Sequence, residues 1–150
     1  MKDKRKISPL LLANNIGSLM SRTLLRMKLE LQRRFNENGY PLTTDHWGIL
    51  QVLFKEDGLS QIELAKALAK DTPNITRMLD VMEKNGFIDR RPDPDDRRKH
   101  LIIKTNKAVK MKKELFLISS SAQDKIFNNI SKNDLKKFKD MMERMYANLE

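Results

Sequence analysis

The sequence predicts a mainly α-helical fold with one small β-hairpin. Apolar residues recur every three or four positions through most of the 150 residues, as one face of a helix requires. Turn signals such as Asn38-Gly39, Asp57-Gly58 and Gly86 divide this pattern into separate helices. After Gly86 the pattern changes to two short runs on either side of a polar turn, and this change predicts the hairpin.

The composition favours a folded protein with a polyanionic partner. Hydrophobic residues make up 39% of the chain, and 30 Lys and Arg against 20 Asp and Glu give a formal net charge of +10. Such an excess of basic residues favours nucleic acid or an anionic membrane surface as the binding partner. The membrane is the weaker choice of partner, because no stretch approaches the roughly 18 uninterrupted apolar residues of a spanning helix. The start of the chain, Met1–Lys6, is expected to be a flexible basic arm rather than a signal peptide. The chain contains no cysteine, which excludes disulfides and fits a cytoplasmic location.

Two helices are expected before the middle of the chain. The first has an apolar residue every three or four positions from Ile16 to Phe35 and ends at Asn38-Gly39. The second begins after Thr43 or Thr44, and its buried side includes Trp47.

Two shorter helices follow, separated by a tight turn. Ser60 and Glu63 have capping-box spacing, in which the hydroxyl and the carboxylate satisfy free amides at a helix start. The next helix is expected to have Thr72 as its N-cap and Pro73 in its first turn. It stops at Gly86. Two short helices across a tight turn, the second of them amphipathic, form a helix-turn-helix.

The hairpin comes directly after the second of these helices. Its strands are expected at 87–91 and 101–103, with the polar turn 92–99 between them. A charged hairpin in this position is a wing. Residues 42–105 are therefore expected to form a winged helix-turn-helix domain.

The remainder of the chain, 106–150, is expected to be helical, with Ser131 as an N-cap. Its apolar seams are longer than the core of a small winged domain needs. Residues 1–36 and 106–150 are therefore expected to form a helical dimerisation region.

The motifs of the central segment have a specific combined spacing. In chain order they are Leu59–Ala65, Asp71, Ile75-Thr76-Arg77, Glu83–Ile88 and Asp96-Arg97-Arg98, the last followed by Ile102 and Thr105. This run resembles the opening helix, recognition helix and wing of the multiple antibiotic resistance regulator (MarR) family of winged-helix transcription factors. Two positions depart from the family pattern: Lys104 stands where Leu is usual, and Ala108 where Gly is usual.

The resemblance implies repression by occlusion of a promoter, relieved when a small aromatic or phenolic effector binds between the dimerisation and DNA-binding parts. Four residues are candidates for lining that pocket, although each is also explained as core: Ile16, Met20, Trp47 and Met111.

The exposed side of the second short helix is expected to contact DNA, because its N-terminal turns enter the major groove in helix-turn-helix proteins. Four residues project from these turns: Pro73, Asn74, Thr76 and Arg77. Asn pairs with adenine and Arg with guanine in bidentate fashion, so Asn74 and Arg77 are the leading candidates for base or nearby phosphate contacts. The alternative is an ordinary solvated helix face.

Arg97 and Arg98 are expected at or beside the minor groove, where narrow A·T tracts concentrate negative potential. The adjacent Asp96 would hold an arginine in place through a charge-assisted hydrogen bond. Further phosphate contacts are expected from residues at a helix start and on the hairpin: Ser60, Gln61, Arg90, Arg91 and Lys99. Helix capping explains the first two equally well, and a plain basic surface explains the other three.

Metal, cofactor and catalytic sites are not expected. His46, near a helix start, and His100, in the wing, are the only histidines and have no neighbouring ligand motif. The sequence has no Gly-rich phosphate loop and no nucleophile elbow.

The sequence therefore predicts a transcriptional regulator that binds a pseudo-palindromic operator on double-stranded DNA as a homodimer, since two-fold symmetry requires matching half-sites. Two alternatives stay open: a sequence-tolerant architectural nucleic-acid-binding protein and a winged-helix protein-interaction module.

Overall fold

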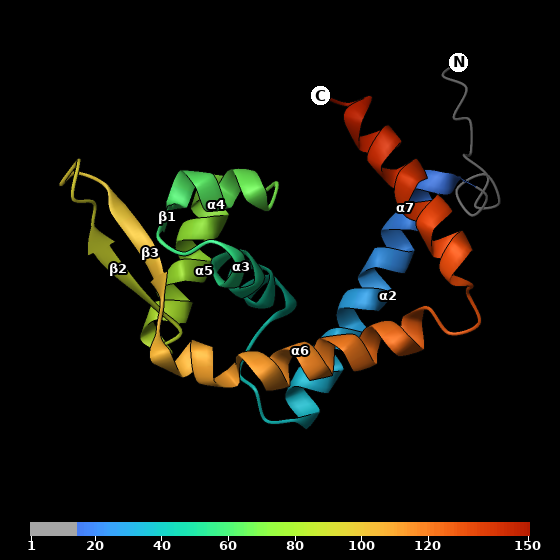
Figure 1. Ribbon diagram of the computed structural model, residues 1–150, viewed down its shortest axis with the longest axis horizontal. Coiled ribbons are helices and arrows are strands. Elements are labelled where there is room, and N and C mark those ends of the chain that lie inside the picture. Colours follow the sequence, from blue (N-terminus) through green and yellow to red (C-terminus); the bar gives the residue numbers. More distant parts are fainter. Residues whose placement is uncertain (1–14) are drawn as a thin grey trace, which may run out of the picture.

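The computed structural model describes residues 15–150 as a mainly helical chain with a three-stranded antiparallel sheet (Figure 1). The basic arm expected at Met1–Lys6 lies outside the described residues. The elements are α2 (Ile16–Glu37), α3 (Thr44–Lys55), β1 (Leu59–Ser60), α4 (Gln61–Ala67), α5 (Thr72–Lys84), β2 (Ile88–Pro92), β3 (His100–Lys104), α6 (Asn106–Ile126) and α7 (Lys132–Ala147). Within residues 15–150, no helix is both long and apolar enough to cross a membrane.

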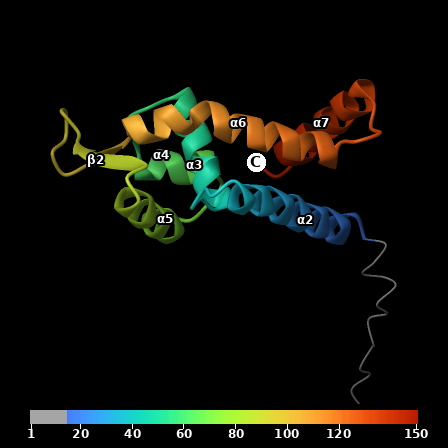
Figure 2. The same ribbon diagram turned by 90° about the horizontal axis from the view of Figure 1, so that it is seen from below.

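The molecule is elongated, with different elements at its two ends. The sheet, α4 and α5 lie at one end, whereas α7 and the N-terminal half of α2 lie at the other (Figures 1 and 2). Helices α2 and α6 run lengthwise between these ends and pack against each other. The segment expected to bind DNA is thus spatially separate from the segment expected to form dimers.

The helix starts follow from local capping. The side chains of Ser60 and Glu63 form the expected capping box at α4. Thr43 caps α3, and His46 takes the place that Glu or Gln usually has in a capping box. Ser131 caps α7, as expected.

The N-cap of α5 is Asp71, one residue before the expected Thr72. Asp71 has an extended backbone, and its Oδ1 accepts a 2.8 Å hydrogen bond from the backbone N–H of Asn74. A carboxylate at this position also interacts favourably with the helix dipole. Thr72 is therefore the first helical residue, and Pro73 lies in the first turn as predicted.

The hairpin has the expected place and a slightly different extent. Its first strand, β2, begins one residue later than the expected 87–91, and β3 is one residue longer at each end than the expected 101–103. The two strands pair antiparallel over five residues each. The short strand β1, which the sequence did not predict, pairs with the other edge of β3 and so joins the start of α4 to the wing.

The core lies under the sheet and between α3, α5 and the start of α6. Trp47 is 2% exposed and packs edge-on against Phe35 of α2 and Phe116 of α6, with ring centroids 6.1 Å and 5.0 Å apart. The expected apolar face of α5 is fully buried: Ile75, Leu79 and Met82. This packing fixes which side of α5 remains available to solvent.

Glu30 of α2 holds the crossing of α2 and α6 together. Its carboxylate pairs with Arg33 and Arg34 on its own helix, at 2.8 Å each, and with Lys125 of α6 at 2.9 Å. Arg33 first, then Lys125 and Arg34, lower the pKa of Glu30 to about 2. The carboxylate is therefore ionised over the whole physiological pH range.

Helix α7 and the first half of α2 expose many apolar side chains. Within residues 15–150, α7 has no buried residue, although apolar positions recur along one stripe of it. The large exposed apolar residues of these two segments are Ile16, Leu19, Leu24, Leu25, Phe138, Met141, Met145 and Tyr146, and Leu29 and Leu149 lie just beyond them. Within residues 15–150, no other segment covers these stripes.

Candidate nucleic-acid interface

The first turns of α5 carry a chain of three hydrogen-bonded polar side chains. Asp71 accepts from the side-chain Nδ2 of Asn74, and Asn74 Oδ1 accepts from Arg77 Nη2 at 2.5 Å. The backbone N–H of Asn74 holds the pKa of Asp71 below its usual range, and hydrogen bonding from the Asn74 amide adds to this effect. All three side chains are exposed. Asn74 and Arg77, both predicted to contact DNA, are thus on the open side of the helix and bonded to each other.

Thr76 and Gln61 join the two helices of the helix-turn-helix. The Gln61 amide Nε2 donates to Thr76 Oγ1 and, at 3.4 Å, to the Thr72 carbonyl oxygen. Thr76 Oγ1 itself donates to the Thr72 carbonyl oxygen at 2.9 Å. Gln61, predicted as a phosphate contact, therefore also ties the start of α4 to the start of α5.

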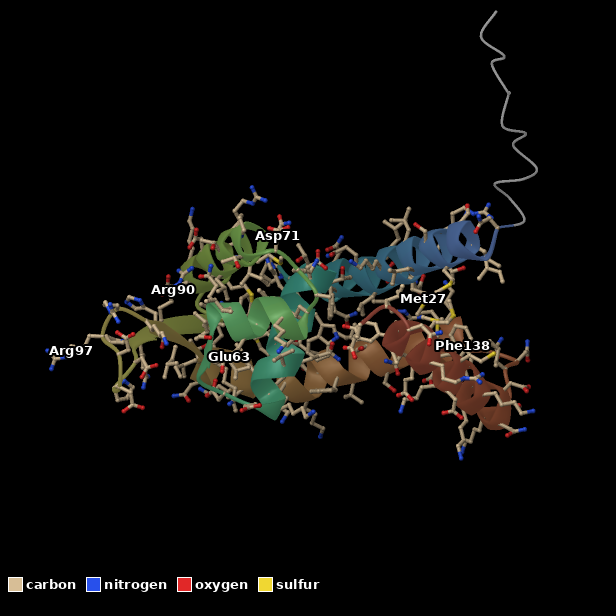
Figure 3. The ribbon with its side chains drawn as sticks, turned by 90° about the horizontal axis from the view of Figure 1, so that it is seen from above. Met27, Glu63, Asp71, Arg90, Arg97 and Phe138 are labelled. Atoms are coloured by element: carbon tan, nitrogen blue, oxygen red, sulfur yellow. The ribbon has the colours of Figure 1, made fainter. Side chains whose placement is uncertain are left out.

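The tip of the wing presents two arginines. Arg98 Nε and Nη2 donate to the two oxygens of Asp96, at 3.1 Å and 3.3 Å, so the two side chains form a fork-to-fork pair. Hydrogen bonds from the Arg98 side chain and backbone lower the pKa of Asp96. The Arg98 side chain is nevertheless 91% exposed. Arg97 lies at the outer end of the molecule and extends away from it (Figure 3).

Arg90 has a different environment from the other wing cations. Its guanidinium lies 2.6 Å from Asp80 and 2.5 Å from Glu83, both on α5, and its side chain is only 22% exposed. Its backbone N–H also donates to Glu83. Arg90 therefore fastens the wing to α5, whereas Arg91, the next residue, is exposed.

An open groove of about 610 Å³ separates the start of α4 from the wing. Ser60, Gln61 and Thr72 line one side, and Lys99 and His100 line the other. Three of the predicted phosphate contacts thus border a single hollow. Ser60 Oγ and backbone N–H both donate to Glu63 at 2.7 Å, so Ser60 also serves as the cap that the sequence offered as its alternative role.

Lys104 departs from the family pattern and has a specific partner. Its Nζ pairs with Asp57 Oδ2 at 2.9 Å, and its backbone N–H donates to Asp57 Oδ1 at the same distance. The lysine therefore joins β3 to the segment after α3. Ala108, the other departure, is fully buried at the start of α6.

The four residues expected to line an effector pocket do not meet within one chain. Ile16 is 69% exposed and 19 residues before Phe35, which contacts Trp47. At 1.5 Å per helical residue this separation is about 28 Å. Met20 is one turn closer, whereas Trp47 and Met111 belong to the core of the other end. The expected pocket of Ile16, Met20, Trp47 and Met111 is therefore not formed by this chain alone.

The two histidines occupy the elements in which they were expected. His46, 7% exposed, lies in the first turn of α3, and its Nδ1 accepts from the backbone N–H of Thr43 at 3.3 Å. Burial lowers the pKa of His46. His100 is the first residue of β3. In the part of the chain that the structure describes, no three His, Asp or Glu residues are grouped so as to hold a metal ion.

Sequence reasoning missed the residues that support the interface rather than form it. Asp80 and Glu83 were not predicted to pair with the wing, and Asp57 was not predicted to pair with Lys104. A signal for Asp80 and Glu83 is present in the sequence: they are two acidic residues three positions apart on the helix that precedes a basic hairpin.

Comparison with known proteins finds others with a similar arrangement. Residues 42–100 match the model of the MarR family. The transcriptional repressor CouR, bound to a 23-mer DNA duplex, is 23% identical with a TM-score of 0.81, over 90% of this chain and 94% of that chain. A MarR transcriptional regulator from Methanosarcina mazei Go1 is 22% identical with a TM-score of 0.79, over 89% and 94%. A mutant MarR from E. coli complexed with operator DNA is 18% identical with a TM-score of 0.80, over 86% and 91%. The predicted winged helix-turn-helix fold with flanking helices is thereby confirmed.

Proposed function

Because residues 42–100 match the model of the MarR family, we propose that the protein is a sequence-specific transcriptional regulator that binds double-stranded DNA. The observation that carries the proposal is the pair of oriented, exposed arginines at the two places where a winged helix-turn-helix meets a duplex. Arg77 is held at the start of α5, and Arg98 at the tip of the wing. Helix N-terminal turns enter the major groove and cationic wings approach the minor groove.

The proposed mode of binding divides the contacts by chemistry. Arg77 reads a base edge in the major groove, and the exposed wing arginines Arg97 and Arg98 bind at or beside the minor groove. Phosphate contacts fix the register, and they come from the groove between α4 and the wing and from Arg91. Two structural relatives support this proposal, since CouR is bound to a DNA duplex and the E. coli MarR mutant to operator DNA.

We further propose that the protein works as a homodimer in the cytoplasm and represses transcription from a pseudo-palindromic operator. The exposed apolar stripes of α2 and α7 support the dimer, because they lie at the end of the molecule away from the wing and no other part of the described chain covers them. Operator binding by such an isologous dimer requires two copies of α5 about one DNA turn apart.

A small aromatic or phenolic effector is proposed as the signal that releases DNA. Such a ligand need only bind better to a dimer whose recognition helices are wrongly spaced. Because Ile16 and Met20 do not reach Trp47 within one chain, any pocket that contains all four candidates requires residues from the second chain.

Selection of genomic DNA fragments with the purified full-length protein tests the proposal. Recovery of a common palindromic sequence supports an operator-binding regulator, and its loss on addition of an aromatic ligand supports an effector. Binding of all fragments alike would instead favour a sequence-tolerant architectural protein. Failure to bind any DNA at moderate salt would favour a protein-interaction module.

A further inference from the structure

The side-chain amide of Asn74 is engaged at both ends. Its Nδ2 donates to Asp71, and its Oδ1 accepts from Arg77 Nη2. A bidentate contact with adenine needs both the donor and the acceptor of the amide. Nδ2 and Oδ1 each keep one further hydrogen-bonding site, but the bonds to Asp71 and Arg77 fix the direction in which these sites point.

Arg77 keeps the capacity to read a base while it is bonded to Asn74. A guanidinium carries five N–H donors, and the bond to Asn74 uses one of its nitrogens, Nη2. The Arg77 side chain is exposed on the open side of α5. Guanine offers two acceptors, O6 and N7, that the remaining donors can reach in the major groove.

Asp71 provides the fixed end of the chain. Its Oδ1 accepts from the backbone N–H of Asn74 at 2.8 Å, so the carboxylate is tied to the helix start. The same N–H lowers the pKa of the Asp71 carboxyl and so favours its ionised form. Because this fixed anion accepts from Nδ2 of Asn74, the other end of the amide, Oδ1, is turned toward Arg77.

We propose that Asn74 is a positioning residue: Asp71 orients its amide, and the amide orients Arg77, which reads a guanine in the major groove. This inference rests on the proposed function and specifies the base recognised at that site. It has a consequence that an independent role for Asn74 does not have: Asn74 and Arg77 must determine base preference at one and the same base pair.

The test uses the full-length protein, an operator recovered by genomic selection, and all single-base-pair variants of that operator. Arg77→Ala should lower discrimination at one G·C pair of each half-site by about 5- to 150-fold. Asn74→Ala and Asn74→Ser should lower discrimination at that same pair and leave the other pairs unchanged. In the Arg77→Ala background, Asn74→Ala should have no further effect on it. Asn128→Ala, which changes an exposed asparagine beyond the end of α6, is the matched control and should change nothing.

Two results would overturn the inference. One is a loss of discrimination at a separate A·T pair in the Asn74 variants, since Asn74 would then read adenine itself. The other is full discrimination at the G·C pair in an Asn74 variant whose circular dichroism matches that of the wild type. The proposed function fails in a different way, because in that case the selection recovers no operator at all.

Discussion

Arg90 of the wing lies with its guanidinium 2.6 Å from the carboxylate of Asp80 in the recognition helix α5. Glu83, one turn further along the helix, pairs with the same guanidinium. The wing and the recognition helix are thus joined by their side chains as well as by the short segment between them. If both contact one duplex, this clamp sets the angle between the two contacts.

Arg90→Gln should lower the stability of the fold and should have little effect on the electrostatic attraction to DNA. The three partners are partly exposed, so we expect the free energy of unfolding to fall by only about 1 kcal/mol. Because Arg90 is already paired with carboxylates, the dependence of DNA affinity on salt should change less than it does in Arg91→Gln. Urea denaturation and binding at several salt concentrations measure the two effects. Equal changes in salt dependence for the two variants would mean that Arg90 leaves its partners to bind phosphate.

Arg98→Ala should flatten the salt dependence of DNA binding. One cation near a phosphate contributes about 0.9 to the slope of log K against log salt concentration, so the slope should fall by about that amount for each protomer. Asp96→Asn is the matched variant, because it removes the negative charge that pairs with Arg98 and leaves the arginine in place. It should keep the slope and reduce preference for the operator. An unchanged slope in Arg98→Ala would exclude an electrostatic role for this arginine.

The capping histidine of α3 should make stability depend on pH. The pKa of His46 in the folded protein lies below its ordinary value of 6.5, because burial disfavours the imidazolium. As the pH falls below about 6.5, the unfolded chain binds a proton that the folded protein binds only at lower pH, so the free energy of unfolding falls. Protonation of Nδ1 would also break the bond from the Thr43 N–H.

His46→Gln is the control for this pH effect, because Gln can complete a capping box and does not titrate. Urea denaturation at about pH 7.5 and about pH 5.5 should show a loss of stability in the wild type at the lower pH. The loss should be smaller in His46→Gln. An equal loss in both proteins would place the pH dependence elsewhere.

The proposed dimer predicts a strong effect of charge on α7. Phe138 is 52% exposed within one chain and belongs to the apolar stripe of that helix. Phe138→Glu should weaken dimerisation by about 3 kcal/mol or more, since each copy loses the burial of one large apolar side chain. Lys136→Glu, on the same helix but outside the stripe, is the control. Sedimentation velocity over a range of concentrations distinguishes monomer from dimer, and an unaffected dimer would place the interface elsewhere.

Features encoded by neighbouring residues could be predicted from the sequence. The capping box of Ser60 and Glu63 and the N-cap Ser131 depend only on residues a few positions apart, and both are confirmed. The N-cap of α5 was misplaced by one residue, because Asp71 and Thr72 both suit that position and only the observed backbone distinguishes them.

Features that depend on distant contacts could not be predicted. Strand β1 has two residues, too few for a periodic pattern, and exists because β3 pairs with it. The ion pair of Asp57 with Lys104 joins segments 47 residues apart. The separation of the pocket candidates within one chain could not be predicted for a related reason: periodicity places Ile16 and Trp47 on apolar faces, but only the length and direction of α2 show how far apart they lie.

The central claim is that α5 and the wing together recognise a particular DNA sequence. The most direct test compares the dissociation constants of the selected operator and a random duplex of equal length, at one fixed salt concentration. The proposed function predicts that the operator binds at least about 1,000-fold more tightly, and that Arg77→Ala removes much of this ratio. Equal affinity for the two duplexes in the wild-type protein would contradict it.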